Sequence, residues 1–162
     1  MTQSQRFLLH YLSWVAVLFL LFYLDTNSLS HWINETQRQW LLDALRFFLG
    51  EDRVRGLDIL AHPHFRIIIT RACNGLIPYY LYLAAILAYP RSWKARLTWA
   101  VLGYGVISAV NLLRLLMVTA LVAKNPSNFH WAHDLLGNAL LMVTGLGLFY
   151  GFLRRSRPTR SI

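Results

Sequence analysis

The sequence contains one cysteine, Cys73, among 162 residues, and only 14% of its residues are charged. A single cysteine excludes an internal disulfide, so a thiol facing an oxidising compartment is explained by reactivity or by burial. The low charge, combined with 56% hydrophobic residues, is unusual for a soluble domain of this length. The composition therefore favours a membrane protein made of one domain, residues 1–162.

Acidic residues are also few, seven against sixteen basic ones, which gives a net charge of +9. In a soluble protein this excess would suggest nucleic acid, but here the cations are distributed by compartment and no nucleic-acid partner is expected. Residues 1–6, 90–97 and 154–162 hold eight cations and no acid. By the positive-inside rule these segments are cytoplasmic, with both termini inside.

Four apolar runs approach or exceed the roughly 18 residues needed to cross a bilayer. They predict transmembrane helices at approximately residues 7–24, 73–89, 98–123 and 135–153. The first run is followed by no A-x-A-like cleavage site, so we expect a retained anchor rather than a signal peptide. The fold class predicted is an all-α integral membrane protein with about four transmembrane helices in the lipid bilayer.

Residues 25–72 are predicted to form a small cap on the outer side. Within them, residues 32–49 place apolar side chains at helical spacing, which predicts an amphipathic helix that either lies on the membrane surface or packs in the cap. The apolar positions are Ile33, Trp40, Leu41, Ala44, Phe47 and Phe48. Residues 54–60 and 65–70 are β-prone and flank the segment AHPH, whose proline suits a turn, so a β-hairpin is expected before Cys73.

Three reactive side chains are predicted to lie at one depth. An arginine inside a transmembrane helix costs about 3 kcal/mol on insertion scales, so Arg114 should face protein or a wet cavity. It lies roughly 14 Å from the outer end of its helix, at a rise of about 1.5 Å per residue. Cys73 begins the second predicted helix, and His130 and His133 lie in the segment that starts the fourth, all at the outer boundary. An imidazole can accept the thiol proton and a cation can stabilise an oxyanion, which is the chemistry of acyl transfer.

Of the two histidines, His133 is the predicted base. The segment around Pro126 looks like a loop, which places His130 at the start of the helix and His133 inside it, where one rotamer can be held. Gly137 lies one turn further along the same face and leaves room beside His133. Asp134 is expected to face elsewhere and to meet water or Lys124.

Three short motifs together resemble those of the exosortase and archaeosortase family of membrane transpeptidases, in a short, minimal form. The motifs are Cys73-Asn74-Gly75, Asn111-x-x-Arg114 and His133-x-x-x-Gly137. Their order, spacing and shared side of the membrane make the set more specific than any one of them.

The resemblance implies a cysteine-dependent cleavage of C-terminal sorting signals on exported proteins, through a thioacyl intermediate and without a cofactor. It implies Cys73 as nucleophile, His133 as general acid and base, and Arg114 as the transition-state stabiliser. The implied substrate-binding or supporting residues are Asn74, Gly75, Asn111, Gly137 and His130. The implied substrates carry a recognition motif, a transmembrane helix and a basic tail, and the implied location is the cytoplasmic (inner) membrane, with the site on the outer, periplasmic side.

Two other classes of function are also consistent with these residues. A metal-binding membrane protein would gather outer-face ligands from His62, His64, His130, His133 and Cys73, although none of their spacings is diagnostic and Arg114 would repel the ion. A non-catalytic scaffold or transport subunit would instead pair Arg114 with lipid or with an acid of a partner.

Overall fold

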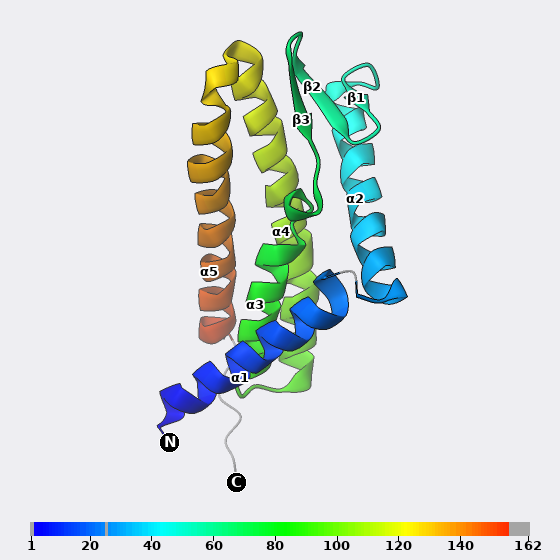
Figure 1. Ribbon diagram of the computed structural model, residues 1–162. Helices are drawn as coiled ribbons and strands as arrows, with labels where there is room; N and C mark the ends of the chain where they lie inside the picture. Colours follow the sequence, from blue (N-terminus) through cyan, green and yellow to red (C-terminus); the bar gives the residue numbers. More distant parts are fainter. Residues whose placement is uncertain (1, 25, 156–162) are drawn as a thin grey trace.

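Two long antiparallel helices, α4 (Trp93–Lys124) and α5 (Asn138–Arg155), run the length of the molecule in the computed structural model, which describes residues 2–24 and 26–155 (Figure 1). Helix α4 begins where the Ser92 hydroxyl accepts the backbone N–H of Ala95. A short 3-10 turn, η3 (Pro126–Asn128), and a π-helical segment, η4 (Trp131–Gly137), lead from α4 into α5.

Helices α3 (Leu76–Ala88) and α1 (Gln3–Leu18) pack against this pair, and α1 continues as the π-helical η1 (Phe19–Tyr23). Helix α1 crosses α3 obliquely (Figure 1), and Leu18 of α1 shares a buried cluster with three residues of α3. The beginning of α1, the α3–α4 connection and the end of α5 lie at one end of the molecule. That end carries Arg6, Arg91, Lys94, Arg96, Arg154 and Arg155 and is called the basic end below.

The cap consists of helix α2 (Ser28–Leu49) and an antiparallel sheet in the order β1-β2-β3. The strands are β1 (Val54–Arg55), β2 (Asp58–His62) and β3 (Phe65–Ile68), and Ile59 pairs with Ile67. Buried apolar side chains of α2, β2 and β3 pack on the part of α4 remote from the basic end. The sheet is thereby fixed to the helix that carries Arg114.

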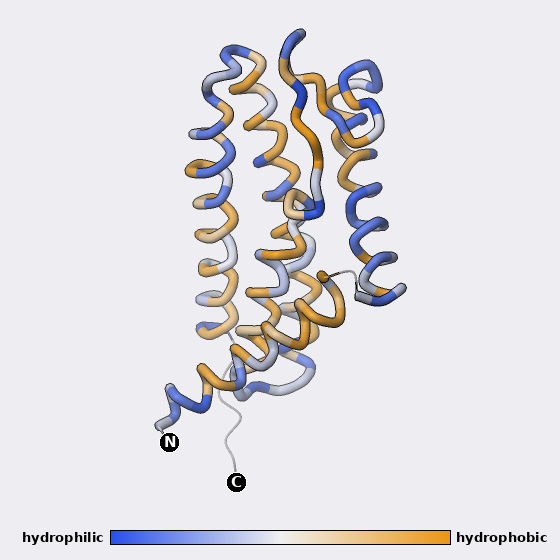
Figure 2. The backbone as a smooth tube through the Cα atoms, viewed as in Figure 1, coloured by the Kyte–Doolittle hydropathy of each residue, from blue (hydrophilic) through white to orange (hydrophobic). Residues whose placement is uncertain are grey.

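Three helical segments in the described residues are long and apolar enough to cross a membrane: Gln3–Tyr23, Trp93–Lys124 and Pro126–Arg155. Helix α3 is also apolar but has only 13 residues. Figure 2 shows hydrophobic residues concentrated in α1, α3 and the adjoining parts of α4 and α5, whereas much of α2 is hydrophilic. The prediction of an all-α membrane protein is confirmed.

The structure differs from the prediction in two features on the cap side of α3, the start of that helix and the number of strands. The second apolar run becomes helical only at Leu76, because Gly75 has φ +81°, which an α-helix cannot continue, so Cys73 lies in a 3-10 turn before the helix. The predicted hairpin is present as β2 and β3, but the earlier β-prone run turns at Gly56, φ +60°, and supplies β1 as a third strand.

The predicted apolar face of α2 is only partly the buried one. Leu41 is buried together with Leu42 and Leu45, while Trp40, Phe47 and Phe48 are exposed. The buried face also includes Asn34 and Gln37, so apolar periodicity alone assigned it incorrectly. Helix α2 is thus packed in the cap and at the same time presents exposed apolar side chains.

Candidate functional site

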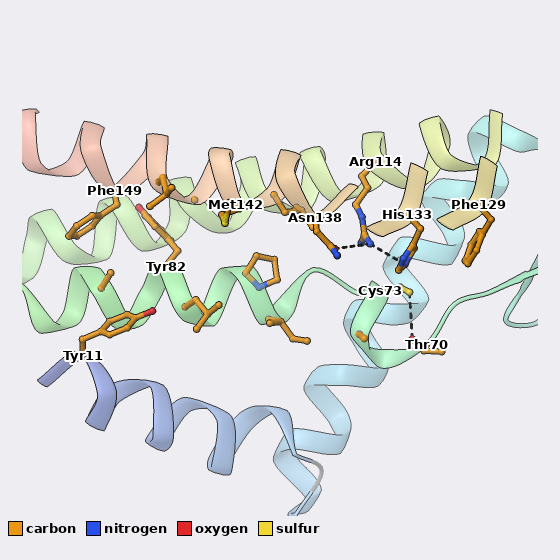
Figure 3. A pocket seen from close by; sticks show the side chains of 18 of the residues that line it. Tyr11, Thr70, Cys73, Tyr82, Arg114, Phe129, His133, Asn138, Met142 and Phe149 are labelled. Carbon is orange, nitrogen blue, oxygen red and sulfur yellow. Dashed lines mark hydrogen bonds between the residues drawn. The ribbon is translucent and has the colours of Figure 1, made fainter. Parts of the chain in front are cut away.

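A cavity of about 940 Å³ opens between α1, α3 and α5, and Cys73, Arg114 and His133 all line it. Figure 3 shows these three side chains at one end of the cavity, contributed by the turn before α3, by α4 and by η4. The predicted convergence of a thiol, a guanidinium and an imidazole is therefore present in the structure.

Cys73 is held in the 3-10 turn η2 (Arg71–Cys73). Its N–H donates to the carbonyl of Thr70 at 3.0 Å, and its sulfur lies 3.5 Å from the Thr70 hydroxyl. The Asn111 side chain donates to the Cys73 carbonyl at 2.8 Å. A buried thiol on a turn fixed from both sides has few positions available to it.

The two residues after Cys73 complete this turn. The Asn74 side chain accepts the N–H of Leu76 at 3.0 Å and so joins the turn to α3. Gly75 has φ +81°, and a Cβ added there would lie 3.2 Å from the Asn111 side chain. The backbone conformation therefore favours glycine, and a side chain at this position would also press on Asn111 of α4.

Helix α2 supplies two buried amides that reach the same turn. Gln37 donates to the Asn74 carbonyl at 3.2 Å, and the Asn74 side chain donates to Asn34 at 3.1 Å. The Tyr104 hydroxyl of α4 donates to Gln37, and Asn34 donates to the carbonyl of Ser30 at 2.8 Å. This amide network, Asn34, Gln37, Asn74 and Tyr104, attaches the cap to the turn that carries Cys73.

Arg114 is 4% exposed and makes contacts on three sides. One terminal nitrogen lies 3.4 Å from the side-chain oxygen Oδ1 of Asn111, and the other lies 3.1 Å from Nε2 of His133 and 3.4 Å from Oδ1 of Asn138. Its Nε is buried and finds no hydrogen-bond acceptor among residues 2–24 and 26–155. The terminal nitrogen beside Asn111 makes one hydrogen bond within the described residues and carries a second N–H that a further acceptor can meet.

The neighbours of His133 determine its tautomer. Nδ1 lies 2.8 Å from a carboxylate oxygen of Asp134, which can only accept, and Nε2 lies 3.1 Å from Arg114, which can only donate. A neutral imidazole that satisfies both carries its proton on Nδ1 and a lone pair on Nε2. The lone pair on Nε2, which would act as the base, is thus directed toward the guanidinium. The His133 ring is also stacked on Phe129, with ring centroids 5.2 Å apart.

Asp134 does not face away as predicted, because it binds both histidines. His130 contacts its second carboxylate oxygen at 3.0 Å. The His130 side chain is 91% exposed, compared with 25% for His133, and does not line the cavity. His130 and Asp134 are four residues apart and meet across one helical turn, while the Asp134 carboxylate reaches His133 from the adjacent position. Residues 131–137 are π-helical, a distortion that is frequent at functional sites.

Gly137 leaves room for Arg114. A Cβ at this position would lie 2.5 Å from Nε of Arg114, a separation at which one of the two groups must shift. The predicted free space next to His133 thus exists, and the arginine side chain of the neighbouring helix fills it. Each motif glycine accommodates a polar side chain of α4, Gly75 for Asn111 and Gly137 for Arg114.

Four lining or contacting residues were missed from the sequence: Thr70, Phe129, Asn138 and, in its actual role, Asp134. Asn138 had a usable signal, since it is a polar residue within the apolar run LLGNALLMV, and polar residues in membrane segments are usually functional. Thr70 and Phe129 carry no such signal. Their contribution depends on how the strand and the π-helix are placed.

The ligands suggested for a metal site do not assemble. The His62 and His64 rings lie 6.0 Å apart on the hairpin, and neither lines the cavity. Among the described residues, no group of three His, Cys, Asp or Glu side chains is placed to share an ion.

Comparison with known proteins gives a family assignment. The family model of the transmembrane exosortases matches residues 3–150, which is most of the chain. No curated protein and no solved structure matches the sequence. The matched region includes α1, the cap, and all three motifs that surround the cavity, and the chain therefore belongs to the transmembrane exosortase family.

Proposed function

We propose that this protein is a cysteine transpeptidase or protease that cleaves C-terminal sorting signals of exported proteins through a thioacyl intermediate on Cys73. The observation that carries the proposal is the Arg114–His133 contact of 3.1 Å beside Cys73 in one cavity. Base and oxyanion stabiliser are thus adjacent to a single buried nucleophile, as acyl transfer requires. The expected substrates are proteins with a recognition motif, a transmembrane helix and a basic tail.

The depth of the site supports a location at the outer membrane boundary. Lys94 and Arg114 are separated by about 30 Å of α4, at about 1.5 Å per residue, and the hydrocarbon core is about 30 Å thick. If the basic end lies at the cytoplasmic surface, Arg114 lies at the opposite boundary. We therefore place the site on the outer, periplasmic side of the cytoplasmic membrane.

In the first step, Nε2 of His133 takes the proton of the Cys73 thiol and the sulfur attacks the scissile carbonyl carbon. The oxyanion that forms is stabilised by donors of Arg114. The C–N bond then breaks, and the imidazolium returns its proton to the leaving amine. In the second step, an amine or water attacks the thioester, and its proton passes through His133 to the departing sulfur or to solvent.

Two further residues assist His133 and Arg114 in this scheme. Asp134 keeps the Nδ1 proton in place and stabilises the imidazolium when it forms. Before attack, Arg114 donates a hydrogen bond to the lone pair of Nε2, so the guanidinium must turn away from the imidazole before His133 can act as a base. Asn138 lies at 3.4 Å from the same guanidinium nitrogen and can hold it in either position.

The test is a processing assay with a tagged substrate and the variant Cys73→Ser. Wild type is expected to release the shortened product. The serine variant is expected to insert normally and to leave the substrate intact, because a hydroxyl is far less acidic than a thiol and His133 is a modest base. Processing by Cys73→Ser at near the wild-type rate would contradict a thiol nucleophile.

A further inference from the structure

The cavity continues from the reactive residues as a groove along α3 and α5. Its polar side chains gather at the Cys73 end, where Thr70, Arg114, His133 and Asn138 lie. Further along, the lining is dominated by apolar residues such as Pro78, Leu81, Leu141, Met142 and Leu146. The groove thus changes from polar to apolar along the direction in which the helices cross the membrane.

The other end of the groove is bounded by aromatic rings. Phe7 of α1 lies 6.3 Å from Phe149 of α5 and 6.2 Å from Tyr11, measured between ring centroids. From this contact, α1 and α5 diverge toward Cys73 (Figures 1 and 3). Helix α1 therefore lines the groove only near the basic end, through Phe7 and Tyr11.

We propose that this groove binds one face of the transmembrane helix of the substrate, immediately after the bond that Cys73 attacks; this rests on the proposed function. A peptide within hydrocarbon must satisfy its own backbone hydrogen bonds. Among the described residues that line the apolar stretch of the groove, Tyr11 and Tyr82 alone have polar side chains, and Tyr82 already donates to the carbonyl of Trp99 at 2.8 Å. An extended peptide would leave its N–H groups unpaired there, whereas a helix would not.

The dimensions fit a helix that is partly embedded. From Asn138 to Phe149, α5 runs about 17 Å, and a helix of that length with a diameter of about 10 Å occupies about 1,300 Å³. The whole cavity, which also includes the space beside Cys73, measures about 940 Å³, so it can hold one side of such a helix and leaves the other side to lipid. Gly145 lies in the α5 wall, with no atom within 4 Å of the position its Cβ would take, which allows two helix backbones to approach closely.

The test is photocrosslinking from the full-length chain in the membrane of the organism that makes it. The probe is benzoylphenylalanine, placed at Met142 or at Leu146, both in the groove, with Val143 as the matched control. Met142 and Val143 are 63% and 64% exposed, but only Met142 lines the groove. The background is Cys73→Ala, so that uncleaved substrate stays bound. Crosslinked species are identified by mass spectrometry, and acyl adducts on Cys73 are measured in parallel on the wild-type chain.

We expect the probe at positions 142 and 146 to crosslink to the C-terminal transmembrane helix of another protein, with a yield at least tenfold higher than at position 143. The same protein is expected to acylate Cys73. If Cys73 is acylated but the crosslinks are to lipid only, or are equal at 142 and 143, the groove assignment is wrong and the proposed function stands. If the helix is captured but Cys73 is never acylated, the groove assignment stands and the proposed function fails. Absence of both results contradicts both.

Discussion

His133 and His130 share the carboxylate of Asp134 but lie in different surroundings. His133 is held by Arg114 and by the ring of Phe129, whereas His130 points away from the cavity. His133→Ala is expected to reduce acylation of Cys73 by about 100-fold or more, the lower range for a lost general base. His130→Ala should change it by less than threefold. Rates of adduct formation for the two variants, measured side by side, test this, and the reverse order would reassign the base.

Gly137 is expected to be as sensitive as a catalytic residue although it has no side chain. In Gly137→Ala, the new methyl group displaces the Arg114 guanidinium, and loss of an oxyanion donor costs about 100-fold in rate. Gly147→Ala, in the following helix α5, is the matched control, because nothing lies within 4 Å of its Cβ position. Cleavage rates and melting temperatures of both variants are compared. Equal activity of the two would show that Arg114 tolerates the displacement.

Among the elements, α2 has a role that its sequence pattern does not reveal. Gln37 is expected to act as a positioning residue, because it joins the Asn74 carbonyl to the Tyr104 hydroxyl. Gln37→Leu leaves the buried Asn74 carbonyl without this donor, which costs about 1–3 kcal/mol and loosens the turn that carries Cys73. The cost at the Tyr104 hydroxyl is smaller, because Tyr104 is 42% exposed. We expect slower acylation and faster alkylation of the Cys73 thiol by a small reagent.

Gln39→Leu is the control for this prediction, since Gln39 is exposed on the same helix and bonds only to Glu35 in the described residues. A purely structural role for Gln37 would lower the melting temperature and leave thiol reactivity unchanged at temperatures well below it. That result would show that α2 does not position Cys73.

The sequence predicted those elements whose signal is local. Apolar run length located the long helices, and the β-prone runs around Pro63 predicted β2 and β3. The amide network was not predictable in this way, because Asn34 and Gln37 have the spacing of ordinary solvent-facing residues. They are buried by segments distant in the sequence, among them Asn74, about 40 positions later. The start of α3 was also missed, since it depends on the left-handed conformation of Gly75.

At the site, the three motifs identified Cys73, Arg114 and His133 as residues that line one cavity, because each motif combines a reactive group with a small or polar neighbour. What the motifs could not specify is which atoms meet. The pairing of Asp134 with His133 depends on the orientation of an imidazole that Arg114 and Phe129 contact, and the space beside Gly137 is defined by the opposite helix. Such features arise from tertiary packing rather than from spacing along the chain.

For the whole molecule, the orientation in the membrane is a further prediction. The cations of the basic end predict that both termini are cytoplasmic. In a Cys73→Ser background, a cysteine introduced at Ile162 should resist a membrane-impermeant maleimide in intact cells and react after permeabilisation. One introduced at Gly56, in the cap, should react without permeabilisation. Labelling of position 162 from outside would invert the topology and place the cavity on the cytoplasmic side.

The central claim is that Cys73 becomes acylated by its substrate. The most direct measurement is the mass of the intact protein after incubation with a protein that carries a C-terminal motif, a transmembrane helix and a basic tail. The account predicts an added mass equal to the N-terminal cleavage product, located on Cys73, removed by hydroxylamine and absent in Cys73→Ser. Cleavage of that substrate with no adduct on Cys73 under any trapping condition, or an adduct that persists in Cys73→Ser, would contradict it.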